Sequence, residues 1–318
     1  MKFRTELNIP PSRFSIGHTD GVVLIGSCFS INIGDRLQKY KFTGITHPFG
    51  TVYNPVSIAR LLDYAAGAGI VDNKNLIFSS GIWVHPDFHS SLGSPDRDRA
   101  AEGINDAIVQ AGECLRRVKF LFVTLGTSIV YKWKRTGNIV ANCHKLPASE
   151  FARQTVPAQE GAEALAAAFD QLRKINPAIR IILTVSPVRH VRDGLIENMR
   201  SKARLFEMVD ILCSSFDYVS YFPAYEWMMD DLRDYRFYTQ DLIHPNEQAI
   251  DYIWEKFCDH YFDEKTRALV KSIGKVLEGL GHRPFNPDTS EHKSFLAKLQ
   301  EDISRLEQDH PWLKIERE

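Results

Sequence analysis

Short apolar runs alternate with longer helix-like stretches over most of the chain. The apolar runs occupy residues 22–27, 42–46, 119–125, 180–186 and 217–222, and the helix-like stretches occupy residues 30–40, 55–66, 97–117, 159–175 and 198–214. The runs are apolar throughout, which is typical of strands covered on both faces. Strand–helix alternation of this kind favours parallel strands joined by right-handed crossovers. We therefore predict an α/β fold with a five-stranded parallel sheet in a doubly wound, flavodoxin-like order.

Two segments interrupt this rhythm. Residues 76–95 are rich in small polar and aromatic residues and are expected to form a long loop or a short hairpin. Residues 129–147 contain two short strand-like runs around a turn at 135–138, which predicts a second hairpin. Insertions at strand ends commonly form the walls of a binding pocket.

The pattern becomes helical after the α/β part ends. We predict helices at 264–280 and 288–308, and we divide the chain into an α/β domain (1–262) and a C-terminal helical extension (263–318). Phe295, Leu299 and Ile303 recur at helical spacing among charged residues. We therefore expect the apolar face of this helix to pack against another part of the protein or against a partner. Packing on its own domain is the favoured interpretation, and a homodimer contact is the alternative.

Composition narrows the classes of partner. The 318 residues include 39 Lys and Arg against 40 Asp and Glu, so the net charge favours neither nucleic acid nor an acidic membrane surface. The five cysteines are scattered without the spacing of a zinc site, and we expect no metal. The start lacks the apolar run of a signal peptide, and no stretch reaches transmembrane length. We expect a cytoplasmic protein.

The first apolar run ends at Gly26, and Ser27 and Cys28 follow at the start of the next helix. In open α/β proteins the carboxyl edge of the sheet is where ligands bind. The N–H groups and dipole of a helix start lower the pKa of a thiol and stabilise an oxyanion. Cys28 is therefore a candidate thiolate nucleophile, and Ser27 is the alternative. The competing interpretations are a small buried side chain for Cys28 and a helix cap for Ser27.

Asp241 and His244 form a second candidate group. At this spacing one carboxylate can hold the imidazole and fix which ring nitrogen accepts a proton. Pro245 suits the first turn of a helix over 246–262. Because Asp-x-x-His is a short pattern, an unrelated loop histidine is the competing interpretation.

The turn Gly-Ser-Cys-Phe-Ser at 26–30 resembles the motif that names the GSCFA family, a branch of the SGNH/GDSL hydrolase-like superfamily. The other matching stretches are His-Pro-Phe-Gly-Thr-Val-Tyr-Asn-Pro at 47–55, Leu-Gly-Thr at 125–127, Asn-Cys-His-Lys at 142–145, Ser-Pro-Val at 186–188, Tyr-Phe-Pro at 221–223, and Asp241 with His244-Pro245. The similarity runs from about residue 20 to about residue 250. It implies a three-layer α/β/α fold and a hydrolase or acyltransferase that acts on esters.

The resemblance also implies roles for single residues. The superfamily's nucleophilic serine is the third residue of its turn, and Cys28 stands at that position. His244 is then the general base, with Asp241 as its orienting carboxylate. The N–H groups of Cys28 and Gly50 correspond to the oxyanion hole.

The third sequence motif of the superfamily supplies an asparagine whose amide donates to the oxyanion. The corresponding residues of this chain, Gly-Thr-Ser-Ile at 126–129, contain no asparagine. Losing one such donor costs about 3 kcal/mol of transition-state stabilisation. Asn54 or Asn142 is expected to replace it, or Thr127 to donate weakly. We assign Thr127, Asn142 and His144 to substrate binding.

Other polar residues receive weaker assignments. Four basic or amide residues near strand ends are candidates for holding an anionic or sugar substrate, with structural salt bridges as the competing interpretation: Lys145, Arg189, Asn198 and Lys202. The histidines at 85, 89, 144 and 190 fit no metal-binding spacing and are expected in loops or pocket walls. The aromatic side chains after the fifth strand, Tyr225 among them, are expected to pack rather than to stack on a ligand.

Two functional hypotheses follow. In the first, the chain transfers an acyl group from a small-molecule or saccharide ester through Cys28 (or Ser27), Asp241 and His244, and it needs no cofactor. In the second, the chain has lost catalysis and binds a carbohydrate or acyl ligand, as the missing asparagine and the cysteine in place of serine suggest. Nucleotide binding is disfavoured, since no Gly-x-Gly-x-x-Gly or Walker pattern follows the first strand.

Overall fold

The computed structural model describes residues 4–316. Its central sheet has five parallel strands: β1 (Val22–Gly26), β2 (Gly44–Thr46), β5 (Phe120–Leu125), β9 (Arg180–Val185) and β10 (Val219–Tyr221). The strands lie in the order β10-β9-β5-β1-β2. Numbered by their occurrence in this sheet, that is the 2-1-3-4-5 order of flavodoxin-like folds. The predicted fold class is confirmed, including its five parallel strands.

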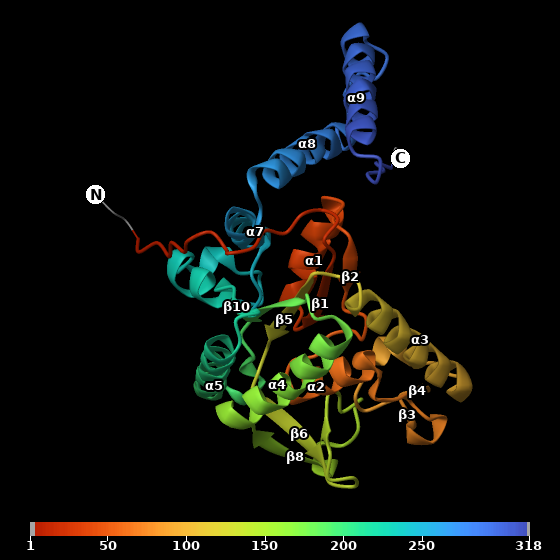
Figure 1. Ribbon diagram of the computed structural model, residues 1–318, viewed down its shortest axis with the longest axis vertical. Helices are drawn as coiled ribbons and strands as arrows, with labels where there is room; N and C mark the ends of the chain where they lie inside the picture. The colour runs from red at the N-terminus through yellow and green to blue at the C-terminus, as the bar shows by residue number, and fades with distance from the viewer. Residues whose placement is uncertain (1–3, 317–318) are drawn as a thin grey trace.

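Helices cover both faces of the sheet (Figure 1). One layer contains α2 (Pro55–Asp63), α3 (Arg97–Leu115), α4 (Ala158–Ile175) and α5 (Leu195–Ser215), and the other contains α1 (Phe29–Lys39) and α7 (Glu247–Tyr261). Within β1 the division is visible residue by residue, because Val23 and Ile25 face the first layer while Val22 and Leu24 face the second. The three central strands β1, β5 and β9 are thus buried on both sides, which explains their continuous apolar sequences, whereas the edge strands β2 and β10 are partly exposed.

The two insertions form small antiparallel sheets. Residues 76–95 contain the hairpin of β3 (Ile77–Ser79) and β4 (Ile82–Val84). The second insertion pairs β6 (Ile129–Trp133) with β7 (Ile139–Val140) as predicted, and also with β8 (Phe151–Thr155). Strand β8 was not predicted, because its inner residues Ala152, Arg153 and Gln154 lack a strand-like apolar pattern. The remaining helical turns are Tyr64–Ala68, Asn73–Asn75, Ser90–Leu92, Ala148–Glu150, Val191–Asp193, Ala224–Glu226 (α6), Trp227–Asp231 and Tyr235–Phe237.

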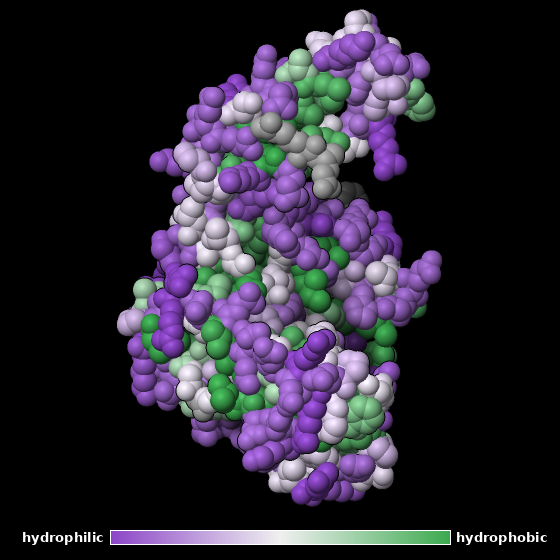
Figure 2. Space-filling model, turned by 90° about the vertical axis from the view of Figure 1, so that its right-hand side faces the viewer, coloured by the Kyte–Doolittle hydropathy of each residue, from purple (hydrophilic) through white to green (hydrophobic). Residues whose placement is uncertain are grey.

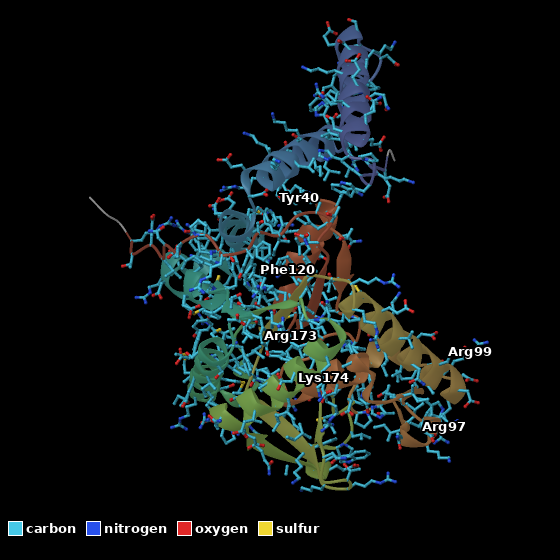
Figure 3. All side chains as sticks on the ribbon, in the orientation of Figure 1. Tyr40, Arg97, Arg99, Phe120, Arg173 and Lys174 are labelled. Carbon is cyan, nitrogen blue, oxygen red and sulfur yellow. The ribbon has the colours of Figure 1, made fainter. Side chains whose placement is uncertain are left out.

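The C-terminal part forms an arm of two helices, α8 (Glu264–Leu280) and α9 (Ser290–Asp309), that extends from the α/β body (Figure 1). Its apolar residues make a small core of their own, which contains Ile273, Leu299 and Ile303. Tyr40 packs against this core at the junction with the body (Figure 3). Figure 2 shows a largely hydrophilic surface on the arm and a notch between its outer end and the body.

Among the helices of residues 4–316, none combines the length and the apolar character needed to cross a bilayer.

Candidate active site

The turn after β1 depends on Gly26. Its φ of 132° lies in the region that favours glycine, and a Cβ at this position would come within 2.2 Å of the Thr124 carbonyl oxygen. Gly26 and Thr124 are direct partners in the β1–β5 register. The absence of a side chain therefore lets the chain leave β1 close to β5 and enter α1 at once.

Of the two candidate nucleophiles, Cys28 is the accessible one. Ser27 is 2% exposed, and its Oγ is buried without a hydrogen-bond partner in the described part of the chain. Cys28 is partly exposed and occupies the N-cap position of α1. The Ser27 N–H donates to the Thr124 carbonyl, which ties that residue to the sheet rather than to the surface. The geometry favours Cys28 over Ser27.

The electrostatic environment of Cys28 differs from the expected activated thiolate. Burial raises the pKa of the Cys28 thiol and outweighs three opposing influences, which are the N–H groups of Cys28 and Phe29 and the positive charge of Lys202. The helix start does act in the predicted direction, but desolvation is the larger effect. The prediction of a thiol whose pKa lies below the ordinary value is therefore wrong, and Cys28 needs a base to give up its proton.

Asp241 and His244 meet as predicted. Nδ1 of His244 lies 2.6 Å from Oδ2 of Asp241, and both side chains are about half exposed. Oδ1 of Asp241 accepts hydrogen bonds from Thr239 Oγ1 and from the N–H groups of Ile243 and His244. These bonds hold the pKa of the Asp241 carboxyl well below its usual range, the His244 backbone bond being the largest influence. An ionised carboxylate thus fixes the imidazole.

Helix packing relates this pair to Cys28. Cys28 begins α1, and His244 precedes the start of α7 by three residues. Arg36 of α1 pairs with Glu247 and Asp251 of α7, at 2.8 and 2.6 Å. Arg36 lies eight residues after Cys28, about 12 Å along α1, so these ion pairs join the start of α7 to the part of α1 far from Cys28. In the described part of the chain no hydrogen bond joins Cys28 to His244.

Of the two groups predicted to complete the oxyanion hole, the Gly50 N–H is engaged, whereas the Asn54 side chain is engaged only through its acceptor oxygen. The Gly50 N–H donates to the His47 carbonyl at 2.9 Å, and the Asn54 Oδ1 caps α2 by accepting from the Ser57 N–H at 2.8 Å. A donor that satisfies a backbone carbonyl is not free for a substrate oxygen. Gly50 therefore does not fit its predicted role in this arrangement, and Asn54 serves as a helix cap. The N–H groups of Cys28 and Phe29 remain as donors that face the sulfur.

The three predicted substrate-binding residues have structural partners. Thr127 is buried, with Oγ1 2.9 Å from Ser201 Oγ, and Asn142 Oδ1 accepts from the His144 N–H. Nε2 of His144 lies 2.8 Å from the His85 carbonyl oxygen. The His144–His85 contact joins the two insertions, the Thr127–Ser201 contact ties the end of β5 to α5, and the Asn142–His144 bond is local. Nδ1 of His144 is buried without a hydrogen-bond partner in the described residues.

A serine–histidine contact that was not predicted lies beside the turn. Ser30 Oγ is 2.8 Å from Nε2 of His47, whose Nδ1 lies 3.3 Å from the Gly50 carbonyl oxygen. Burial lowers the pKa of His47, so its imidazole is neutral. Ser30 is fully buried, and the pair braces α1 against the loop after β2. The only sequence signal was the position of His47 in a matching motif.

The weaker assignments have mixed outcomes. Arg189 donates to the hydroxyl groups of Tyr235 and Tyr238, and Asn198 Oδ1 accepts from the His190 N–H. Lys202 is 1% exposed, with Nζ bonded to the Gly126 and Ser186 carbonyls. A lysine so placed does not reach a surface substrate, and no salt bridge explains it in the described residues. Asn198, Ser201 and Leu205, which lie four and one positions before it and three positions after it in α5, are also buried. This helical spacing was the signal that could have indicated an internal position for Lys202.

Known proteins resemble this chain weakly in three dimensions. A family 3 carbohydrate esterase from Talaromyces cellulolyticus is 10% identical, with 80% of this chain and 98% of that chain covered and a TM-score of 0.36. A family 3 carbohydrate esterase from Clostridium thermocellum is 10% identical over 80% and 98% of the two chains, with a TM-score of 0.33. The acetyl xylan esterase Est2A from Butyrivibrio proteoclasticus is 11% identical over 80% and 64%, with a TM-score of 0.36. No curated protein matches the chain.

The sequence comparison is more specific. The model of the GSCFA family matches residues 21–257, which include the Gly26 turn and the Asp241–His244 pair. A second model, the C-terminal domain of GSCFA domain proteins, matches residues 273–318. The first match alone spans well over half of the 318 residues. The chain therefore belongs to the GSCFA family.

Proposed function

We propose that the chain is an ester hydrolase or acyltransferase in which Cys28 is the nucleophile and His244, oriented by Asp241, is the general base. The observation that carries this proposal is the 2.6 Å contact between His244 Nδ1 and Asp241 Oδ2, in a loop that leads into the helix packed on α1. A carboxylate on Nδ1 leaves Nε2 as the proton-accepting nitrogen.

In the proposed reaction Nε2 of His244 takes the proton of the Cys28 thiol as the sulfur attacks the ester carbonyl carbon. A carbon–sulfur bond forms, and the carbonyl oxygen becomes an oxyanion near the N–H groups of Cys28 and Phe29. Collapse of this intermediate breaks the bond to the alcohol, which leaves with the proton from His244. Water or a sugar hydroxyl, which gives its proton to His244, then attacks the thioester carbonyl carbon. The carbon–sulfur bond breaks, the acyl group passes to the attacking oxygen, and the Cys28 sulfur takes the proton back from His244.

Two structural features constrain this mechanism. The raised pKa of Cys28 makes proton removal by His244 a necessary step rather than an accessory one. The side chains must also come within hydrogen-bonding distance when substrate binds, and catalytic hydrogen bonds in unliganded enzymes are often long. The exposed loop that carries the pair includes Leu242 at a φ of 59°, a conformation unusual for a leucine.

A binding protein without catalysis is the second candidate. It is favoured by the engaged Gly50 N–H and by the raised pKa of the Cys28 thiol. In this alternative a carbohydrate or acyl ligand occupies the edge of the sheet without forming a thioester.

Ester hydrolysis separates the two candidates. We expect p-nitrophenyl acetate, or an acetylated saccharide, to be cleaved by the wild type and by Cys114→Ala, a control cysteine on α3. Cys28→Ala and His244→Ala should each lower kcat/KM by about a hundredfold or more, while Ser27→Ala should change it little. Equal activity in wild type and Cys28→Ala would rule out the cysteine mechanism, and ligand binding without turnover would support the second candidate.

A further inference from the structure

We propose that Arg189 is a positioning residue for the general base: by holding Tyr235 and Tyr238, its guanidinium group fixes the loop that carries Asp241 and His244 to the end of β9. This inference rests on the proposed function, because it concerns the placement of that same imidazole. Arg189 would act through the loop and would not touch the substrate.

The general base lies in a loop that is closed by its own hydrogen bonds. The Thr239 N–H donates to the His244 carbonyl at 2.8 Å, and next to this bond Tyr238 is the bridge partner of Pro245. In the described part of the chain, the hydrogen bonds of residues 239–244 all stay within that range. The position of His244 therefore depends on what holds Tyr238.

Arg189 holds Tyr238 and the nearby Tyr235. One terminal nitrogen of the guanidinium donates to the Tyr238 hydroxyl at 2.9 Å, and the other donates to the Tyr235 hydroxyl at 3.4 Å. The guanidinium carbon also lies 4.7 Å from the Tyr238 ring centroid and 5.4 Å from the Tyr235 ring centroid. Tyr238 is buried in the apolar layer on that side of the sheet, so packing and the guanidinium fix it together. A planar fork of N–H groups can meet two hydroxyls and two rings at once, which an ammonium cannot do.

No carboxylate competes for this guanidinium in the described residues. None of the ion pairs formed within residues 4–316 includes Arg189. The salt bridge that was the competing interpretation for this residue is therefore not formed there. Its side-chain hydrogen bonds go instead to two uncharged phenols, and they join the segment after β9 to the segment that leads into the loop.

The end of β5 connects Arg189 to the nucleophile. The carbonyl of Thr124 accepts the N–H of Ser27, the residue before Cys28, at 3.0 Å. The next carbonyl along the strand accepts the N–H of Ser186, three residues before Arg189, at 2.9 Å. Because β1 and β9 both pair with β5 in parallel, the two segments leave the sheet at the same edge. A path of backbone bonds and guanidinium contacts thus runs from the turn of the nucleophile to the loop of the base.

Steady-state kinetics with p-nitrophenyl acetate test this inference, because that substrate has no net charge for a guanidinium to bind. We expect Arg189→Met to lower kcat by about tenfold or more, since small misplacements of a catalytic group are costly, and to keep KM within about twofold of the wild type. Arg189→Lys should restore little of the loss, because an ammonium lacks the planar fork. An unchanged kcat in folded Arg189→Met, or an effect confined to the KM of acidic esters, would overturn the inference.

Arg236→Met is the matched control for the loss of charge. It removes a guanidinium from the same segment, but one whose carbon lies 4.9 Å from the Phe237 ring centroid and which bonds neither tyrosine hydroxyl in the described residues. We expect this variant to keep the wild-type kcat. A loss equal to that of Arg189→Met would make charge near the site the cause and would overturn the inference.

A double-mutant cycle separates positioning from a general loss of structure. In the His244→Ala background there is no base to place, so Arg189→Met should change kcat by less than about twofold. Equal losses in both backgrounds would overturn the inference, because they would mean that Arg189 only supports the fold. Tyr238→Phe covers the case in which Arg189→Met does not fold. It removes the hydroxyl at 2.9 Å and keeps the ring, and it should lower kcat with the same dependence on His244.

Alkylation of Cys28 tests the same inference without an ester. Modification by iodoacetamide at neutral pH, followed by peptide mass spectrometry, should slow in His244→Ala because the thiol loses its base. We expect Arg189→Met to slow it toward the His244→Ala rate, and the double variant to slow it no further. If His244→Ala slows alkylation and Arg189→Met does not, only this inference fails. If both slow alkylation but no ester is cleaved, only the proposed function fails.

Discussion

Nδ1 of His244 lies 2.6 Å from Oδ2 of Asp241, while Oδ1 of the same carboxylate accepts the N–H groups of Ile243 and His244. One carboxylate thus holds both the imidazole and the backbone that carries it. Because Oδ2 contacts the imidazole and Oδ1 accepts the backbone N–H groups, a substitution at Asp241 can change the contact with His244 and still keep the hydrogen bonds that hold the loop.

Replacing Asp241 by Asn tests the orienting role. The amide oxygen can still accept the backbone N–H groups, but the amide nitrogen is a donor and disfavours the tautomer with a proton on Nδ1. We expect kcat to fall by about a hundredfold or more with little change in the melting temperature. Thr239→Ala removes one hydrogen bond to Oδ1 and leaves the His244 contact, so its kcat should remain within about threefold of the wild type. Equal losses in the two variants would contradict the assigned role.

Gly26→Ala tests the geometry of the turn. The added methyl group would meet the Thr124 carbonyl at 2.2 Å and force a φ of 132° on an alanine. We expect the free energy of unfolding in urea to fall by about 3 kcal/mol. Gly103→Ala is the matched control, because Gly103 lies in α3 with no neighbouring atom within 4 Å of the new Cβ. That change should stabilise the protein by about 0.5–1 kcal/mol, and equal effects at both positions would argue against a strained turn.

The fold was predictable because its three central strands, β1, β5 and β9, are buried on both faces. The run Val22–Gly26 is apolar throughout, and the helix after it begins within a residue or two of the expected position. Strand β8 was not predicted because Arg153 and Gln154 are both exposed. They lie on a small sheet, where contacts with neighbouring strands determine the pairing more than the sequence pattern does.

The site was predictable only in part. Asp241 and His244 are local in sequence, so spacing alone indicated their contact. The Gly50 N–H is used in a local turn with the His47 carbonyl, three residues back, which a search for an oxyanion donor overlooks. The partners of Lys202 are set by tertiary structure, and no spacing in the sequence marks them. The pKa of Cys28 was mispredicted for a related reason, since burial depends on the whole fold and exceeded the local influence of the helix start.

The stability of the protein should depend on pH through Lys202. Its pKa of about 7 in the folded chain lies below the ordinary value of 10.5, so between these values the unfolded chain holds a proton that the folded chain lacks. The free energy of unfolding contributed by this group therefore rises from pH 7 toward 10.5, and below pH 7 the full penalty remains. We expect urea unfolding of the wild type, relative to Lys202→Met, to improve as the pH rises through this window. Parallel stability curves would contradict the lowered pKa.

The C-terminal arm should lose order independently of the site. Ile273 is fully buried in the arm's own core, and Ile273→Ala should destabilise it by about 2–4 kcal/mol. Hydrogen exchange should then accelerate in α8 and α9 but not in the central sheet. Leu296→Ala, at a half-exposed position of α9, should alter exchange little. Faster exchange in β1 or β5 would show instead that the arm supports the body.

The favoured interpretation, in which the arm packs on its own domain, predicts a monomer in sedimentation equilibrium. The homodimer alternative predicts twice that mass, and it predicts dissociation by substitutions on exposed apolar residues of the arm such as Phe285 and Leu296. A dimer that persists with both residues changed to Asp would assign the contact elsewhere.

Acyl-enzyme mapping tests the central claim most directly. Protein mixed with p-nitrophenyl acetate would be quenched in acid during turnover, digested and sequenced by mass spectrometry. A single acetyl group on Cys28, absent from Cys28→Ala and accumulating far more slowly in His244→Ala, is the predicted result. Acetyl found on Ser27, or undiminished turnover in Cys28→Ala, would contradict the account.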